Sequence, residues 1–115
     1  MFIYEDRYEF DWPVTVVYPA DGGDVEKTFT ARFVLPDDEA EIYAALPGET
    51  TEEKMMAARA RLAAVWIGWS DDIRTPDNQP LTFTPTRRDQ LLKSRAVRLG
   101  VEKAYGEAVL GIREK

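Results

Sequence analysis

The stretch from Lys27 to Val34 constrains the fold most, because its side chains alternate between polar and apolar from Thr28 to Phe33. Successive residues of a strand point to opposite faces, so this alternation predicts a strand with one buried face and one solvated face. The apolar face carries Phe29, Ala31 and Phe33. An Asp-Gly-Gly-Asp turn sequence at 21–24 and a β-branched run at 14–18 come before it, which predicts a hairpin. A lone hairpin is marginally stable, so helices must cover its apolar face.

The strand expected before this hairpin turn carries alternating aromatic residues. Pro13 lies within it, and Pro19 lies at its end. The aromatic residues are Tyr8, Phe10 and Trp12. Pro13 either ends regular pairing or confines this strand to an edge of the sheet, because proline cannot donate to a ladder.

The chain after residue 35 predicts four helices from caps and apolar spacing. Pro36 and the carboxylates after it begin the first, whose apolar stripe ends before Pro47-Gly48 and holds Ile42, Tyr43 and Leu46. Thr50 or Thr51 caps the second. Its stripe contains Met55, Ala58, Leu62, Val65, Trp66 and Trp69. Gly68 could end this helix, and Ile67 could equally belong to an extended segment.

The last two helices lie close together in sequence. Thr84-Pro85 reads as an N-cap followed by proline at the first helical position, and this helix runs through Leu91-Leu92. The final helix ends near Gly111, and its core face holds Val97, Val101, Ala104, Tyr105, Ala108 and Ile112. A second apolar line on roughly the opposite side contains Leu99, Gly106 and Leu110. An apolar circumference this wide indicates a helix that is buried on two sides or meets a partner.

These elements predict an α+β fold, with a small N-terminal antiparallel hairpin or sheet packed against a mainly helical C-terminal part. At 115 residues, and without a repeat or linker, the chain is expected to be a single domain, 1–115. Its β-rich part is 1–35 and its helical part is 36–115. We assign the three tryptophans, Trp12, Trp66 and Trp69, to the core rather than to an interface.

Composition argues against an enzyme. The chain has no His and no Cys, which removes the commonest general base, the commonest transition-metal ligand and thiolate chemistry. Ser70 and Ser94 therefore have no histidine partner for a triad. We expect no catalytic residues and no cofactor.

An oxygen-ligand metal site would have to use the loop that carries Asp71, Asp72, Asp77 and Asn78. These residues lack the alternating spacing and the central glycine of an EF-hand loop. We therefore interpret the loop as a solvated turn whose side chains bind local backbone, and we expect no metal.

Charge divides the chain in two. Residues 1–84 carry 7 Lys and Arg against 17 Asp and Glu, a net charge of −10, whereas residues 85–115 carry 8 against 4, a net charge of +4. A basic cluster in the second part contains Arg87, Arg88, Lys93, Arg95 and Arg98. It could neutralise phosphates, but no aromatic residue interleaves it and the rest of the chain repels DNA. We favour a solvated helix face and expect no nucleic-acid partner.

Neither a membrane span nor a signal peptide is expected. No apolar run reaches the roughly 20 residues that cross a bilayer. The acidic N-terminal sequence lacks a basic region followed by an apolar one. Together with the absence of Cys, this predicts a cytoplasmic protein without a membrane partner.

The order of these pieces resembles the tail assembly chaperones of long-tailed, siphovirus-type bacteriophages, from about Phe10 onward. The segments that carry the resemblance are the hairpin around Asp21-Gly22-Gly23 with Phe29-Thr-Ala-Arg-Phe33, the Val65-Trp-Ile-Gly-Trp69 segment, the turn from Asp71-Asp72 to Pro80-Leu81, Phe83-Thr-Pro85, Leu91-Leu92 and the helix Val97 to Gly111. The chain departs from the family pattern at Arg74-Thr-Pro-Asp-Asn-Gln and at its Arg-Glu-Lys end.

The resemblance implies a partner and a location. Members of the family bind the long, helical, aggregation-prone tape measure protein before tail tube subunits polymerise around it, and are absent from the finished virion. Several are also made as a longer, frameshifted product, which implies a possible contact with the tail tube protein. For this chain it implies tape measure binding and self-association in the host cell cytoplasm, with no enzymatic step.

Such a chaperone needs apolar helix faces that accept another amphipathic helix. Our predicted partner-binding surface consists of Leu91, Leu92, Leu99, Gly106 and Leu110. The alternative is a permanent virion component, such as a structural tail protein or a head-tail connector or terminator, which a small acidic α+β domain suits equally well.

Overall fold

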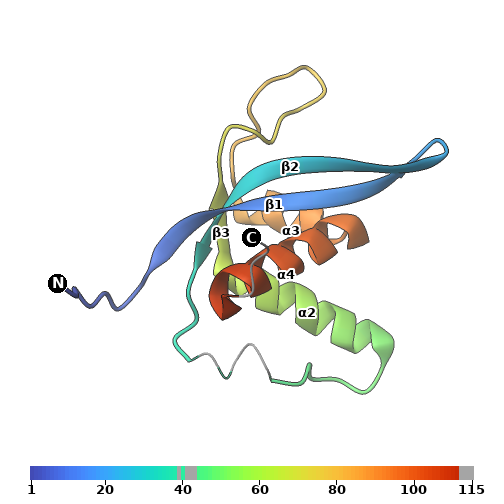
Figure 1. Cartoon of the computed structure of the whole chain (residues 1–115). Coiled ribbons are helices and arrows are strands. Elements are labelled where there is room, and N and C mark those ends of the chain that lie inside the picture. The colour runs from blue at the N-terminus through green and yellow to red at the C-terminus, as the bar shows by residue number, and fades with distance from the viewer. Residues whose placement is uncertain (39, 41–43, 112–115) are drawn as a thin grey trace.

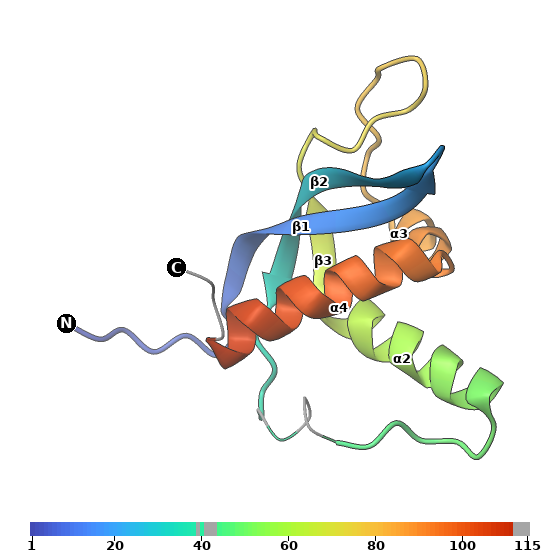
Figure 2. The ribbon, with the colours of Figure 1, turned by 45° about the vertical axis from the view of Figure 1, so that its right-hand side comes forward.

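The computed structural model describes residues 1–38, 40 and 44–111 of the chain, and shows an α+β fold. A three-stranded antiparallel sheet, in the order β1-β2-β3, consists of β1 (Glu9–Ala20), β2 (Gly23–Val34) and β3 (Trp66–Trp69). The helices are α2 (Thr51–Val65), α3 (Pro85–Leu92) and α4 (Arg95–Leu110), and they lie together on one face of the sheet (Figure 1). Figure 2 shows the same layering from a second direction.

The predicted hairpin is confirmed, and it is longer than the sequence pattern indicated. β1 and β2 pair from Glu9↔Val34 to Ala20↔Gly23, and Gly22 takes a positive φ of 76° in the turn. Phe29, Ala31 and Phe33 are buried, as their alternation predicts.

Pro13 and Pro19 do not interrupt β1, because β1 is an edge strand and both sit where their nitrogens face outward. Leu35 N–H donates to Tyr8 O (2.9 Å), so Tyr8 faces Leu35 in a hydrogen-bonded pair. Hydrogen-bonded pairs recur at every second residue of an antiparallel ladder. Pro13 and Pro19 lie an odd number of residues after Tyr8, so both occupy non-hydrogen-bonded positions of the ladder. At these positions no backbone N–H is needed to pair with β2. Of the two expectations for Pro13, confinement to an edge is therefore correct.

The segment from Trp66 to Trp69 is the third strand, so assigning both tryptophans to the stripe of the preceding helix was wrong. β3 pairs with β2 between Ala31 and Phe33, and lies inside the part of the chain predicted to be helical. An i, i+3 pair of large apolar residues fits a helix and a buried strand equally well. The segment is a strand here because it pairs with β2, which lies more than 30 residues away in sequence.

Both threonine caps are confirmed. The Thr50 hydroxyl accepts from Glu53 N (3.0 Å) at the start of α2, and the Thr84 hydroxyl accepts from Arg87 N (3.1 Å) at the start of α3. α4 ends at Gly111, which takes a left-handed φ of 72°. Each threonine cap satisfies a backbone N–H group that the helix itself leaves unpaired.

Of the helix predicted between Pro36 and Leu46, Ala40 is helical, whereas residues 36–38 and 44–46 are not. Ile42 and Tyr43, which would form its stripe, lie outside the described residues, as does Ile112 of the last helix.

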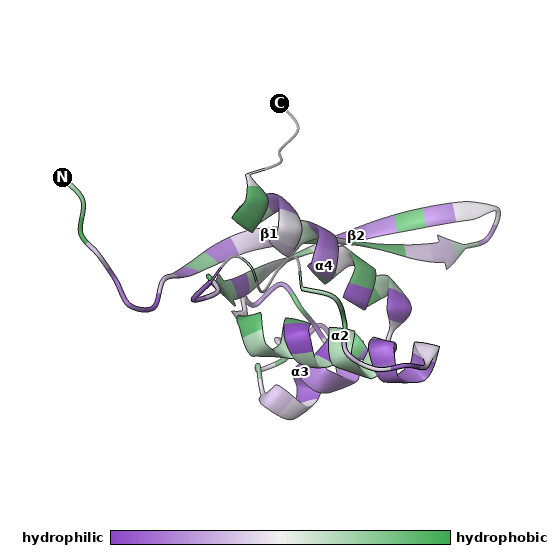
Figure 3. Cartoon of the chain, turned by 90° about the horizontal axis from the view of Figure 1, so that it is seen from below, coloured by the Kyte–Doolittle hydropathy of each residue, from purple (hydrophilic) through white to green (hydrophobic). Residues whose placement is uncertain are grey.

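The core forms where α4 and α2 pack against the sheet. Its buried residues come from all three strands and all three helices: Val14, Val16, Phe29, Ala31, Phe33, Leu62, Trp66, Leu92, Val97, Val101, Ala104 and Tyr105. Trp66 is fully buried, whereas Trp12 and Trp69 are half-buried against this core. Seen from below, the hairpin tip and the N-terminal segment project beyond the helices (Figure 3).

Candidate partner-binding grooves beside the last helix

α4 is held tightly against β1 at one glycine. A Cβ atom on Gly100 would lie 2.6 Å from Thr15 O, so only glycine permits this approach. Five residues later in the helix, the Tyr105 hydroxyl donates to Val34 O (2.9 Å) in a buried hydrogen bond. These two contacts fix the rotation of α4, and so decide which of its residues face solvent.

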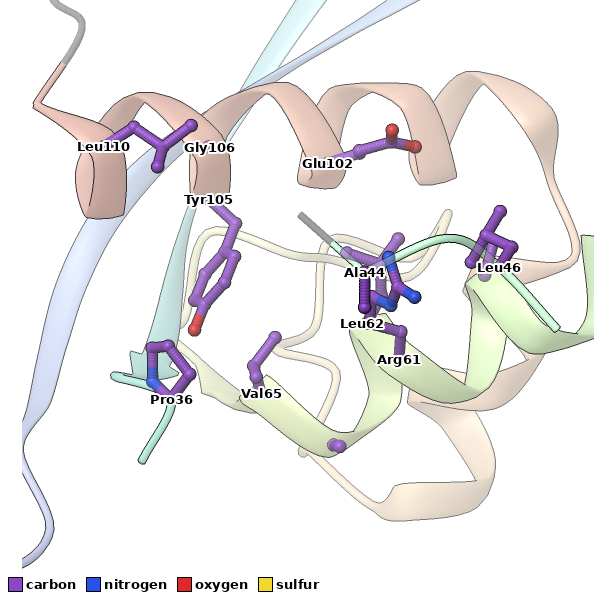
Figure 4. A pocket seen from close by; sticks show the side chains of 12 residues that line it. Pro36, Ala44, Leu46, Arg61, Leu62, Val65, Glu102, Tyr105, Gly106 and Leu110 are labelled. Atoms are coloured by element: carbon purple, nitrogen blue, oxygen red, sulfur yellow. The ribbon is translucent and has the colours of Figure 1, made fainter. Parts of the chain in front are cut away.

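A groove of about 610 Å³ lies between α2 and α4; we call it the α2–α4 groove. Its walls are mainly apolar, and its apolar lining includes Leu46, Leu62, Val65, Tyr105 and Leu110. Arg61 on α2 and Glu102 on α4 place opposite charges on its two walls. Figure 4 shows these side chains around the groove, with Tyr105 and Leu110 projecting from α4 and Val65 from the end of α2.

A second groove, of about 630 Å³, lies on the other side of α4 along the edge strand; we call it the β1–α4 groove. It is lined by Trp12, Pro13, Val17, Ala96 and Leu99, and by the charged residues Glu26, Lys103 and Glu107. Lys103 and Glu107 lie 4.0 Å apart, one helical turn from each other. This groove is therefore more polar than the α2–α4 groove.

The structure divides the predicted partner-binding surface between these grooves. Gly106 and Leu110 line the α2–α4 groove, whereas Leu99, 48% exposed, lines the β1–α4 groove. Leu91 is half-buried against the core and lines neither groove. Leu92 is 1% exposed, so its assignment to a binding surface was wrong: it is a core residue at the end of α3.

The sequence pattern missed the opposite wall of the α2–α4 groove. That wall is built from α2 and the segment before it, through Pro36, Leu46, Ala58, Leu62 and Val65. Ala58, Leu62 and Val65 were recognised as one apolar stripe of α2. The stripe did not show that α4 leaves part of it uncovered.

The acidic loop matches the predicted turn with local backbone contacts only in part. Asp72 Oδ2 accepts from Thr30 N (3.0 Å), which lies far away in sequence, and so satisfies an outward-facing donor of β2 where β3 ends. Asn78 takes a left-handed φ of 62°, and Arg74 Nη1 donates to its carbonyl (3.0 Å). A polar hollow of about 790 Å³ opens beside Asp71 and Asp72. No group of three or more acidic side chains suited to a metal ion occurs in residues 1–38, 40 and 44–111.

Two cations of the basic cluster are used inside the protein. Arg88 donates to Trp66 O (3.3 Å) and to Asp89 Oδ1 (3.1 Å), and Arg87 donates to Thr82 O (2.7 Å). Arg88 thereby ties α3 to the start of β3. The cluster is in part a structural support for the sheet-to-helix connection.

The chain matches no protein-family model, no curated protein and no solved structure. Among the described helices, none combines the length and apolar character needed to cross a bilayer. The two grooves beside α4 are the features of the described structure best suited to bind a partner.

Proposed function

We propose that this chain is a tail assembly chaperone of a long-tailed bacteriophage, which binds the tape measure protein and keeps it soluble until tail tube subunits polymerise. The α2–α4 groove is the observation that carries this proposal. It is mainly apolar and lies between two helices, which is the setting in which an amphipathic helix inserts its apolar side chains.

The groove offers both affinity and orientation to such a helix. Each fully buried Leu, Ile or Phe anchor contributes roughly 1.5–3 kcal/mol. Micromolar binding requires about 8 kcal/mol after association and ordering costs are offset, so the bound helix needs several anchors along the groove. Arg61 and Glu102 lie on opposite walls of the groove. They favour a bound helix that places an acidic side chain beside Arg61 and a basic side chain beside Glu102. The groove needs no cofactor and no covalent step to hold its ligand.

The remaining parts of the proposal follow from the resemblance of the sequence to tail assembly chaperones. The protein acts in the host cell cytoplasm, self-associates, and is absent from the finished virion. A longer frameshifted form would connect the bound tape measure protein to the tail tube protein.

Co-expression tests this function directly. The tape measure protein encoded with this chain is produced with and without it, and the soluble fraction is measured after lysis. The proposal expects the tape measure protein to move from the pellet to the supernatant, in complex with this chain. An insoluble tape measure protein in both cultures would contradict it.

The position of the gene and the composition of purified particles separate a chaperone from a virion component. A chaperone gene is expected immediately upstream of a very long reading frame that encodes a helical protein. Stoichiometric amounts of this chain in purified virions would instead support a structural tail, connector or terminator protein.

A further inference from the structure

The segment before β1 exposes large apolar side chains in succession. We call residues 1–7 the N-terminal arm. Phe2, Ile3 and Tyr4 are 87%, 74% and 75% exposed, and Met1 is exposed as well. The arm leads away from the body of the molecule (Figures 1 and 2). Contiguous exposed apolar side chains mark a surface that meets a partner.

The arm is anchored at its base, and its course bends at Asp6 and Arg7. Tyr8 is paired to Leu35 through the Leu35 N–Tyr8 O hydrogen bond (2.9 Å), and Arg7 Nε donates to Glu9 Oε2 (2.8 Å). The high exposure of Phe2, Ile3 and Tyr4 shows that the arm does not fold back onto its own molecule despite this bend, so its apolar side chains are open to contact with another molecule.

We propose that the arm of one copy docks in the α2–α4 groove of a second copy, and that the two copies exchange arms reciprocally. The proposal rests on the groove named in the proposed function and deepens it, because the arm and the tape measure helix then compete for one site. Reciprocal exchange gives a symmetric dimer in which each copy uses the same two surfaces.

The charges of the arm and the groove are complementary. Glu5 and Asp6 follow the apolar residues of the arm directly, and Arg61 stands on the α2 wall of the groove. Within the described part of the chain, Arg61 forms no ion pair. Glu102 on the opposite wall repels the two carboxylates, so the arm is expected to place them on the α2 side.

The available area suits a weak or moderately stable dimer. Each aromatic side chain offers ~150–250 Å² for burial, so the apolar residues of two arms together offer on the order of 1,000 Å². Specific interfaces bury about 1,200–2,000 Å² in total when both surfaces are counted. Reciprocal docking of two arms therefore reaches the size of a specific contact, and a single arm falls short of it.

Oligomeric state tests the exchange. Sedimentation equilibrium is run from about 5 to 200 μM on the wild type, on a Phe2→Asp, Ile3→Asp variant and on Met56→Asp. Met56 is a matched control, because it is 58% exposed on α2 and lines neither groove. We expect a dimer for the wild type and Met56→Asp, and at least a tenfold rise in the dimer dissociation constant for the arm variant. A monomeric wild type, or an arm variant that dimerises like the wild type, would overturn the proposal.

The absence of cysteine allows the contact to be trapped selectively. Ile3→Cys protein is mixed with Leu110→Cys protein under mild oxidation, and with Met56→Cys protein as the control. Disulfide-linked heterodimers are expected in the first mixture and not in the second. Equal linking in both mixtures would contradict docking in the groove.

The two proposals fail separately. If the chain does not bind the tape measure protein but exchanges arms, the dimer and the cross-link persist and only the co-expression result is negative. If the tape measure protein binds but no exchange occurs, the co-expression result is positive and the wild type is monomeric. If both hold, the arm variant captures the tape measure protein more tightly than the wild type does.

Discussion

Gly100 shows how one residue positions the functional surface. Its missing side chain lets α4 approach Thr15 of β1, and this approach turns Leu110 toward α2 and Leu99 toward the sheet edge. Tyr105 completes the alignment through its hydrogen bond to Val34 O. The positions of both grooves therefore depend on contacts made on the buried side of α4.

Gly100→Ala is expected to lower the free energy of unfolding by about 1–3 kcal/mol, because the new Cβ would overlap a backbone oxygen. Gly106→Ala is the control on the same helix: a Cβ there meets nothing within 4 Å. It should raise the stability by up to about 1 kcal/mol through helix propensity. Urea denaturation of both variants provides the comparison, and equal stabilities would argue against the close approach.

Arg7 and Arg32 lower the pKa of the Glu9 carboxyl, first through the hydrogen bond from Arg7 and then through the charges of both cations. A depressed pKa in the folded state means that this group favours folding above its ordinary pKa. That contribution is lost as the pH falls through the lowered value. Arg7→Gln should raise the pKa of Glu9 in a carboxyl NMR titration, and Lys27→Gln should leave it unchanged. A Glu9 pKa insensitive to Arg7 would show that the base of the arm is not held by this pair.

At the scale of elements, sequence patterns within a few residues predicted the strand and the helix starts that depend on neighbouring residues. The alternation of β2 and the two threonine caps needed only neighbouring residues, and both were predicted correctly. β3 was missed because its strand geometry comes from pairing with distant β2. Trp69 Nε1–H further fixes β3 by donating to Leu81 O (2.6 Å), a contact that spacing along the chain does not reveal.

The Thr84 cap should carry a measurable share of the stability, because α3 is only 8 residues long and begins at this residue. Thr84→Ala is expected to cost about 1 kcal/mol of unfolding free energy, since Arg87 N would lose its acceptor. Thr82→Ala is the matched control, because Thr82 contributes its backbone carbonyl to Arg87. Its stability should stay within a few tenths of a kcal/mol of the wild type. Equal losses in the two variants would rule out a specific capping effect.

At the scale of the whole molecule, the site was only partly predictable. The apolar line through Leu99, Gly106 and Leu110 follows from helix periodicity, and its three residues do lie away from the core face of α4. Which of them share a groove depends on where α2 crosses α4, and periodicity contains no information on that crossing. The structure therefore retains Gly106 and Leu110 as candidates for helix binding, separates Leu99 from them, and returns Leu92 to the core.

The most direct test measures the affinity of the tape measure protein for four forms of this chain: the wild type, Leu110→Asp, Leu99→Asp and Met56→Asp. A charge at Leu110 would have to be buried under the bound helix, so Leu110→Asp should weaken binding at least tenfold. Leu99→Asp and Met56→Asp should bind within about twofold of the wild type, because both residues lie outside the α2–α4 groove. Circular dichroism establishes that all four are folded. Wild-type affinity in a folded Leu110→Asp variant would contradict the assignment of the α2–α4 groove as the binding site.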